Sequence, residues 1–131
     1  MATRYFGQPI KRNEDPRLLV GQATFTDDVH LPGMLHAAFV RSNYAHAIIK
    51  RIDATTARSM PGVVAIFTAE DLGDYWKPGP LLVPPPPVKQ LTFHPRTQVP
   101  LAKTKICHVG EAFAVVIAET RYQAEDAAEQ V

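Results

Sequence analysis

The stretch VGEAFAVVIAET, residues 109–120, contains the clearest strand signal in this chain. Its apolar middle, FAVVIA, is short and rich in β-branched residues, and polar residues bound it. This pattern is typical of a strand that is buried on both faces. A second β-rich segment precedes it across Gly110-Glu111. The segments 104–109 and 112–119 therefore predict a β-hairpin around this turn.

The residues after this strand predict an amphipathic helix over 121–131. Thr120 and Gln123 have the spacing of a capping box at its start. Apolar residues recur at the spacing of one helical face: Ala124, Ala127, Ala128 and Val131. No glycine, basic last turn or proline ends the pattern, so we expect the domain to be truncated at its C-terminus.

Four further segments upstream have the composition of strands and are bounded by turn residues. They are residues 18–25, 34–41, 46–52 and 63–67. The last of these reads VVAIF and is expected to be buried on both faces.

Two short helical segments lie among these strands. A helix is expected from Asp53 to Met60, because the Asp53 carboxylate can accept hydrogen bonds from the first free amides and Pro61-Gly62 can end the helix. Thr68 and Asp71 have the spacing of a cap for one further turn.

Proline dominates the region between 78 and 100, which holds eight of the twelve prolines. Proline fixes φ and donates no hydrogen bond, so the region predicts a long surface loop rather than central sheet. Trp76, just before the loop, is expected to hold it against its own domain or a neighbour, as buried aromatic residues do. A polyproline docking site for another protein is the alternative.

Residues 1–17 are polar and carry two prolines, so they predict an irregular N-terminal arm, and 18–131 is expected to form one folded domain. The basic residues of the arm have two interpretations, solvated side chains or contacts to a partner or cofactor phosphate. They are Arg4, Lys11, Arg12 and Arg17.

The overall composition excludes several classes of protein. Fourteen basic and thirteen acidic residues leave a formal net charge of +1 without a basic cluster, so nucleic acid is not an expected partner. No apolar run reaches the roughly eighteen residues of a membrane helix, and no membrane association is expected. The start lacks the apolar segment of a signal peptide, and a cytoplasmic location is expected. The single cysteine, Cys107, is expected to be buried and inert.

No constellation of residues with a recognisable chemistry is present. The histidines, at 30, 36, 46, 94 and 108, do not have the local spacing of a zinc site, apart from the adjacent pair Cys107-His108. The acidic pairs Asp27-Asp28 and Glu70-Asp71 stand where turns and helix starts favour acid. No nucleophile elbow or phosphate-binding glycine motif occurs. We therefore assign no catalytic, cofactor-binding or metal-binding residue to this chain.

Several segments, taken in order, resemble the opening of one enzyme family. They are DPRLLVG (15–21), DDV (27–29), LPGMLHAAFVRS (31–42), AHA (45–47), IDAT (52–55), PGVVA (61–65), FTAEDL (67–72) and VGEAFAVVIAET (109–120). The chain is similar over nearly its whole length to the N-terminal α/β-hammerhead domain of the large, molybdopterin-binding subunit of the xanthine dehydrogenase, aldehyde oxidase and carbon monoxide dehydrogenase family. The resemblance implies an α+β fold, with a small mixed sheet and two main helices.

The resemblance also implies a function. The chain is expected to be a structural domain of a molybdenum hydroxylase, an oxidoreductase that hydroxylates an aldehyde or N-heterocycle with oxygen from water, and not to be catalytic alone. Molybdopterin with molybdenum, iron–sulfur clusters and FAD are expected in the complete enzyme and none in this chain. The expected partners are the remaining molybdopterin-binding domains, iron–sulfur and flavin subunits or domains, and a second copy in a homo-oligomer. The alternative is a free-standing, non-enzymatic binding module with the hammerhead fold.

Overall fold

The computed structural model describes residues 7–79 and 98–131. By its internal contacts the chain divides into two compact units, Met1–Met34 and Leu35–Val131.

The first unit contains two short helical elements, α1 (Asp15–Leu19) and the 3-10 helix η1 (Thr26–Asp28). The strand predicted over 18–25 was wrong, because Leu18 and Leu19 end α1. A proline in the first turn favours helix, since its missing N–H has no partner to lose there. Within the described residues of this unit, neither helical element has a buried side chain. The backbone preferences of the local sequence therefore determine the structure of these two elements.

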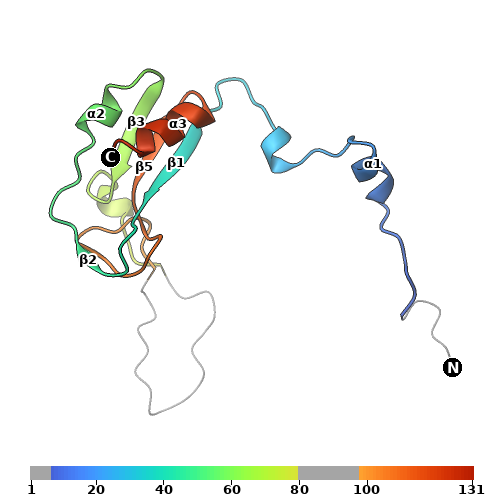
Figure 1. The fold of residues 1–131 in the computed structure, drawn as a ribbon, viewed down its shortest axis with the longest axis horizontal. Coiled ribbons are helices and arrows are strands. Elements are labelled where there is room, and N and C mark those ends of the chain that lie inside the picture. The colour runs from blue at the N-terminus through green and yellow to red at the C-terminus, as the bar shows by residue number, and fades with distance from the viewer. Residues whose placement is uncertain (1–6, 80–97) are drawn as a thin grey trace, which may run out of the picture. The chain divides into compact units, whose positions relative to one another are not determined.

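The second unit is built on a three-stranded antiparallel sheet in the order β1-β5-β3 (Figure 1). The strands are β1 (His36–Arg41), β3 (Val63–Thr68) and β5 (Ala112–Ala118). The apolar run that dominates the sequence thus forms the central strand, and it pairs along both edges. This arrangement confirms the expected α+β fold.

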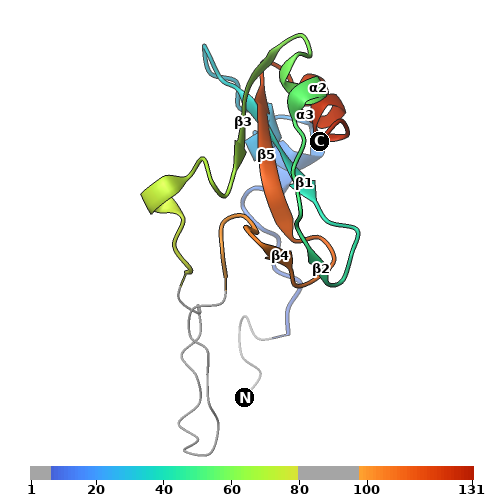
Figure 2. The same cartoon turned by 90° about the vertical axis from the view of Figure 1, so that its left-hand side faces the viewer.

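Two helices cover one side of this sheet. α3 (Arg121–Ala128) packs against β1 and β5, and α2 (Thr55–Arg58) packs against β3. Both lie on the same side of the sheet (Figure 2). Alanines allow this close approach, since Ala57 and Ala127 are fully buried against the alternate residues Ala114 and Val116 of β5.

The hairpin predicted from 104–109 and 112–119 was wrong. β4 (Lys105–Ile106) pairs with β2 (Ala47–Ile48) in a separate two-stranded sheet. The strand predicted over 46–52 is accordingly reduced to two residues. The Gly110 turn bonds to the end of β1 instead, because Gly110 N donates to Ser42 O over 2.8 Å and Ser42 N donates to Glu111 O over 3.0 Å. β5 therefore enters the sheet beside β1.

Burial on both faces was also predicted wrongly for β3 and β5. Phe67 of β3 is exposed, and in β5 Val115 is only half-buried while Val116 is fully buried. The reason is that helices cover a single side of the sheet, so alternate residues of each strand meet different surroundings. Val64 is also exposed, and it lies at the register shift between Val63 and Ala65.

The predicted cap of α3 is present, because Gln123 N donates to Thr120 Oγ1 over 3.3 Å. The prediction that Asp53 caps α2 was wrong: the N-cap residue is Ala54, and the Asp53 carboxylate accepts from Thr55 N over 3.2 Å in the turn before the helix. Both helices are shorter than the sequence pattern indicated, and α3 ends at Ala128 rather than at 131.

The proline-rich segment is described only at its two ends, because residues 80–97, including Phe93 and Pro84 to Pro87, lie outside the described residues. Gly79 N donates to Gln98 O over 2.6 Å in an isolated antiparallel bridge. Trp76 follows the 3-10 helix η2 (Gly73–Tyr75), and its Nε1 donates to Leu101 O over 2.8 Å. The expectation that Trp76 holds the base of this loop to its own domain is confirmed.

Candidate docking site

The acidic pairs form turn contacts, as the sequence predicted. Asp28 Oδ2 accepts a hydrogen bond of 2.9 Å from Phe25 N, and Asp71 Oδ2 accepts from both N and Oγ1 of Thr68 over 2.7 Å. The hydrogen bonds from Thr68 lower the pKa of the Asp71 carboxyl below its ordinary value. Hydrogen bonds from Thr55, with the nearby Arg51 guanidinium, likewise lower the pKa of Asp53.

The single cysteine is exposed, so the prediction that Cys107 is buried was wrong. The reason is its place at the end of the two-residue strand β4, where the chain turns outward. Cys107 N donates to the Glu111 carboxylate, and His108 Nδ1 lies 3.8 Å from the same oxygen, so Glu111 holds this turn together. Across 7–79 and 98–131, no group of three His, Cys, Asp or Glu side chains is arranged to hold a metal ion.

Of the basic residues in the arm, Lys11, Arg12 and Arg17 are all exposed, and Arg12 also pairs with Asp15 over 3.0 Å. Arg4 lies outside the described residues. In the part of the chain that is described, no helix is long and apolar enough to cross a membrane.

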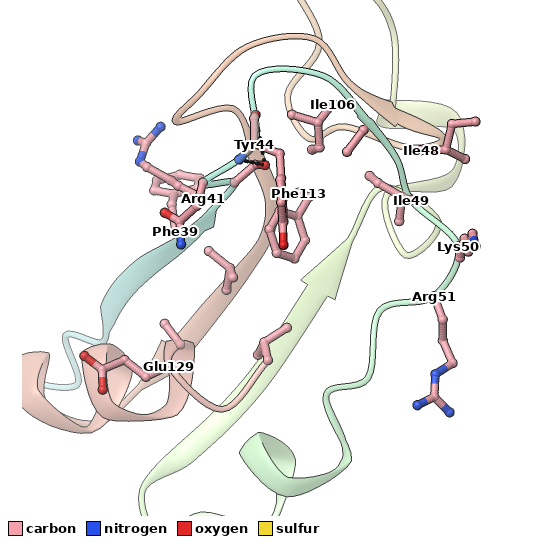
Figure 3. A pocket seen from close by; sticks show the side chains of 16 residues that line it. Phe39, Arg41, Tyr44, Ile48, Ile49, Lys50, Arg51, Ile106, Phe113 and Glu129 are labelled. Carbon is pink, nitrogen blue, oxygen red and sulfur yellow. Dashed lines mark hydrogen bonds between the residues drawn. The ribbon is translucent and has the colours of Figure 1, made fainter.

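A hollow of about 730 Å³ lies between the end of β1, the segment 42–51, β4 and the end of α3. In Figure 3 the half-buried ring of Phe113 lies in the middle of the hollow. Ile49 and Ile106 line it on the side of the small sheet, and Val131 lines it on the side of α3. The middle of the lining is therefore apolar, with polar and charged residues around it, and five separate parts of the unit form it, since Phe113 comes from β5.

Two exposed apolar side chains stand at the edge of this hollow, Tyr44 and Ile48, which are 70% and 73% exposed. Tyr44 lies on a turn that the buried Ser42 fixes, because Tyr44 N donates to Ser42 Oγ over 3.0 Å. The backbone that presents the aromatic ring is thus ordered, although the ring itself faces solvent. An ordered, solvent-facing aromatic residue is typical of a contact surface.

The charged residues around the hollow are mainly basic. Arg41, Lys50 and Arg51 line it together with one acid, Glu129. Arg41 Nη1 donates to Gly110 O over 2.9 Å, and Arg51 Nη2 lies 3.1 Å from Asp53 Oδ2, so protein contacts orient both guanidinium groups. An apolar floor with a basic rim is suited to binding an apolar polypeptide segment that carries a carboxylate.

The sequence analysis did not predict this hollow and gave Tyr44 no role. The one available signal was an aromatic residue between polar turn residues, without a strand or helix pattern to bury it. We name the set Tyr44, Ile48, Ile49, Ile106, Phe113 and Val131 the candidate docking site.

Comparisons with known proteins agree over most of the chain. Residues 20–131 match the family described as aldehyde oxidase and xanthine dehydrogenase, a/b hammerhead domain. The chain is 44% identical over 121 residues to the carbon monoxide dehydrogenase large chain of Afipia carboxidovorans, a match that covers 92% of this chain and 14% of that protein.

Solved structures give the same result. Quinoline 2-oxidoreductase from Pseudomonas putida 86 superimposes with a TM-score of 0.74 at 38% identity, over 92% of this chain and 15% of that one. Aldehyde oxidoreductase from Desulfovibrio desulfuricans superimposes with a TM-score of 0.80 at 28% identity, over 97% of this chain and 14% of that one. The chain thus spans about one seventh of these proteins, and it belongs to the aldehyde oxidase and xanthine dehydrogenase family as its α/β-hammerhead domain.

Proposed function

We propose that this chain is a structural domain of the large subunit of a molybdenum hydroxylase, and that it supports the catalytic domains without contributing a catalytic residue. The proposal rests on one observation: the structural match covers nearly all of this chain but only a small part of the larger protein. Nearly all of this chain superimposes on aldehyde oxidoreductase with a TM-score of 0.80, yet it accounts for only 14% of that chain. A fold that recurs as a small part of a larger enzyme supports a role in its assembly.

The complete protein, in this proposal, hydroxylates an aldehyde or an N-heterocycle with oxygen from water. Molybdopterin with molybdenum, iron–sulfur clusters and FAD belong to its other domains or subunits. The described residues here do not fit a metal centre, because no three metal-binding side chains converge among them. We therefore assign no step of the chemistry to this chain. A cytoplasmic location is part of the proposal and rests on the single cysteine.

The candidate docking site gives this structural role a physical form. A segment of the remaining large subunit fills the hollow, places an apolar side chain over Phe113, and brings a carboxylate near Lys50 and Arg51. Burial of exposed side chains such as Ile48 contributes about 25 cal/mol for each Å² of apolar surface removed from water. The fold thereby couples the stability of this domain to the presence of its neighbours.

A chimaera tests the proposal. In the Afipia carboxidovorans carbon monoxide dehydrogenase large chain, the 121 residues that match are replaced by this chain. We expect the chimaeric chain to assemble and to contain molybdenum by elemental analysis, whereas the same protein with the segment deleted does neither. A chimaera that behaves like the deletion, while this chain alone folds as a stable monomer, would contradict the proposal and favour a free-standing binding module.

A further inference from the structure

The side of the three-stranded sheet opposite to α2 and α3 carries an ordered apolar surface. The strand register places Phe39 of β1, Val115 of β5 and Phe67 of β3 in one row across the sheet. A second row lies two residues away along each strand and contains Ala37, Ile117 and Ala65. We call these six residues the open stripe.

The open stripe lies on the uncovered side because residues at alternate positions along a strand point to opposite faces. The neighbours Val40, Ile66 and Val116 have the other parity, and all three belong to the buried core under the helices. By contrast, Phe39 is 51% exposed and Phe67 is 40% exposed.

An antiparallel sheet with one face in water normally carries polar residues there. All six residues of the open stripe are apolar, and they form adjacent rows rather than scattered positions. Contiguous apolar surface of this kind marks a site of protein contact. The helices α2 and α3, which pack on this sheet, lie on its other side (Figure 2).

The dimensions of the open stripe indicate what covers it. Neighbouring strands lie about 4.8 Å apart, so the outer strands β1 and β3 are separated by about 10 Å. This separation equals the diameter of one α-helix with its side chains, about 10 Å. The two rows also complement each other in size, since large rings flank Val115 in one row and small alanines flank Ile117 in the other. The rings of Phe39 and Phe67 thus lie on either side of Val115 in the open stripe.

One charge lies beside the open stripe. The Arg41 guanidinium lies 5.5 Å from the centre of the Phe39 ring, and its Nη1 donates to Gly110 O. This cation favours an acidic side chain, or the negative end of a helix dipole, at the same end of the open stripe.

We propose that the open stripe is a second docking surface, covered by the apolar face of an amphipathic helix from the remainder of the large subunit. The inference rests on the proposed function. In these two relatives the matching domain accounts for 14% of the chain, so most of the large subunit lies outside it and provides the helix. The helix lies across Phe39 and Phe67 with an acidic group towards Arg41. Phe39 and Arg41 also line the hollow, so the two docking surfaces meet at the end of β1.

Thiol labelling in the chimaera described above tests the proposal. Ala37→Cys is introduced together with Cys107→Ser, and maleimide modification of the new thiol is followed by mass spectrometry of its peptide. We expect this thiol to react in the isolated chain about as fast as in denaturant, and at least tenfold more slowly in the folded chimaera. Equal rates in the isolated chain and the folded chimaera would overturn the inference.

An assembly measurement provides a second, independent test. Phe67→Glu, at a residue of the open stripe that does not line the hollow, is expected to lower the molybdenum content of the purified chimaera at least tenfold, while Tyr122→Glu on α3, at a residue that is 78% exposed, changes it less than twofold. Equal effects from the two would overturn the inference. If the unmodified chimaera itself fails to assemble, the proposed function fails; if it assembles and the Phe67→Glu variant assembles equally well, only the present inference fails.

Discussion

The indole Nε1 of Trp76 donates a hydrogen bond of 2.8 Å to the carbonyl oxygen of Leu101, a residue that is almost fully buried. The ammonium group of Lys103 lies 5.7 Å from the centre of the Trp76 ring. These contacts join the chain before the proline-rich segment to the chain after it. The two ends of the proline-rich segment are therefore held together at its base, where Gly79 also pairs with Gln98.

Trp76→Phe is expected to lower the free energy of unfolding by at least about 1 kcal/mol, because the Leu101 carbonyl loses its donor and the smaller phenyl ring packs less surface. Urea unfolding followed by circular dichroism measures the change. Tyr75→Phe is the matched control, since Tyr75 is exposed and its substitution should leave the midpoint unchanged. If the two variants have the same midpoint, the hydrogen bond contributes nothing.

Gly62→Ala is expected to destabilise the domain more than Gly110→Ala. Both glycines have positive φ, +79° and +84°, so each substitution introduces backbone strain of about 1 kcal/mol or more. At Gly62 the new Cβ would also meet the side chain of Gln123, which Thr120 Oγ1 holds at the start of α3, whereas at Gly110 nothing lies within 4 Å. Thermal melts of the two variants give the comparison, and equal midpoints would show that Gln123 moves aside freely.

Val116→Asp and Val115→Asp distinguish the two sides of the sheet. Val116 is fully buried beneath the helices, so an unpaired carboxylate there is expected to remove more than about 4 kcal/mol, enough to unfold the domain. Val115 belongs to the open stripe, and the same change there is expected to remove about 1 kcal/mol or less. Circular dichroism at neutral pH would show the difference directly. Two folded variants of equal stability would contradict the layer assignment.

The contrast between these valines also shows what the sequence could predict. The run at 112–119 was identifiable as a strand because its composition is local information. The strands that pair with it were not identifiable in this way. β5 pairs with strands that begin at His36 and Val63, whereas the local sequence favoured a hairpin with 104–109 equally well. The Ser42 and Gly110 hydrogen bonds, which decide the outcome, join residues far apart in the sequence.

The docking site was less predictable than the fold. A local pattern indicates which residues are apolar, but Tyr44 and Ile48 matter because they remain exposed after folding. Their exposure depends on where the segment 42–51 crosses the end of α3, which is a tertiary property. The capping residues Thr68 and Thr120 were predictable because their partners lie three residues away.

Asp71→Asn is expected to make the stability of the domain less dependent on pH in the acidic range. Hydrogen bonds from Thr68 lower the pKa of Asp71 below its ordinary value of 3.8, so its ionised form stabilises the folded state. This contribution is complete above pH 3.8 and is lost as the pH falls through the lower pKa of the folded state. The stability difference between the wild type and Asp71→Asn should therefore be present at pH 7 and shrink towards pH 2. A difference that stays constant over this range would show that ionisation of Asp71 has no part in it.

Ile48→Glu is expected to reduce assembly of the chimaeric large chain while leaving the isolated domain as stable as before. The side chain is 73% exposed, so a charge there remains hydrated when the domain is alone. Once a neighbouring segment fills the hollow, the same charge would be buried against Ile49 and Ile106, and an unpaired buried carboxylate is strongly unfavourable. The expected result is an unchanged melting temperature for the isolated variant and a loss of molybdenum content in the purified chimaera.

The sign of the charge gives a sharper test of the same site. The rim carries Arg41, Lys50 and Arg51, and a segment that complements this rim is acidic. Ile48→Glu should therefore repel the incoming segment, whereas Ile48→Lys, which is equally polar and of similar length, should reduce molybdenum content less. Val109→Glu serves as the matched control, because Val109 is 62% exposed and does not line the hollow. If Val109→Glu reduces assembly as much as Ile48→Glu, the hollow has no special role. If Ile48→Lys is the more damaging of the two variants at that position, the segment in the hollow is not acidic.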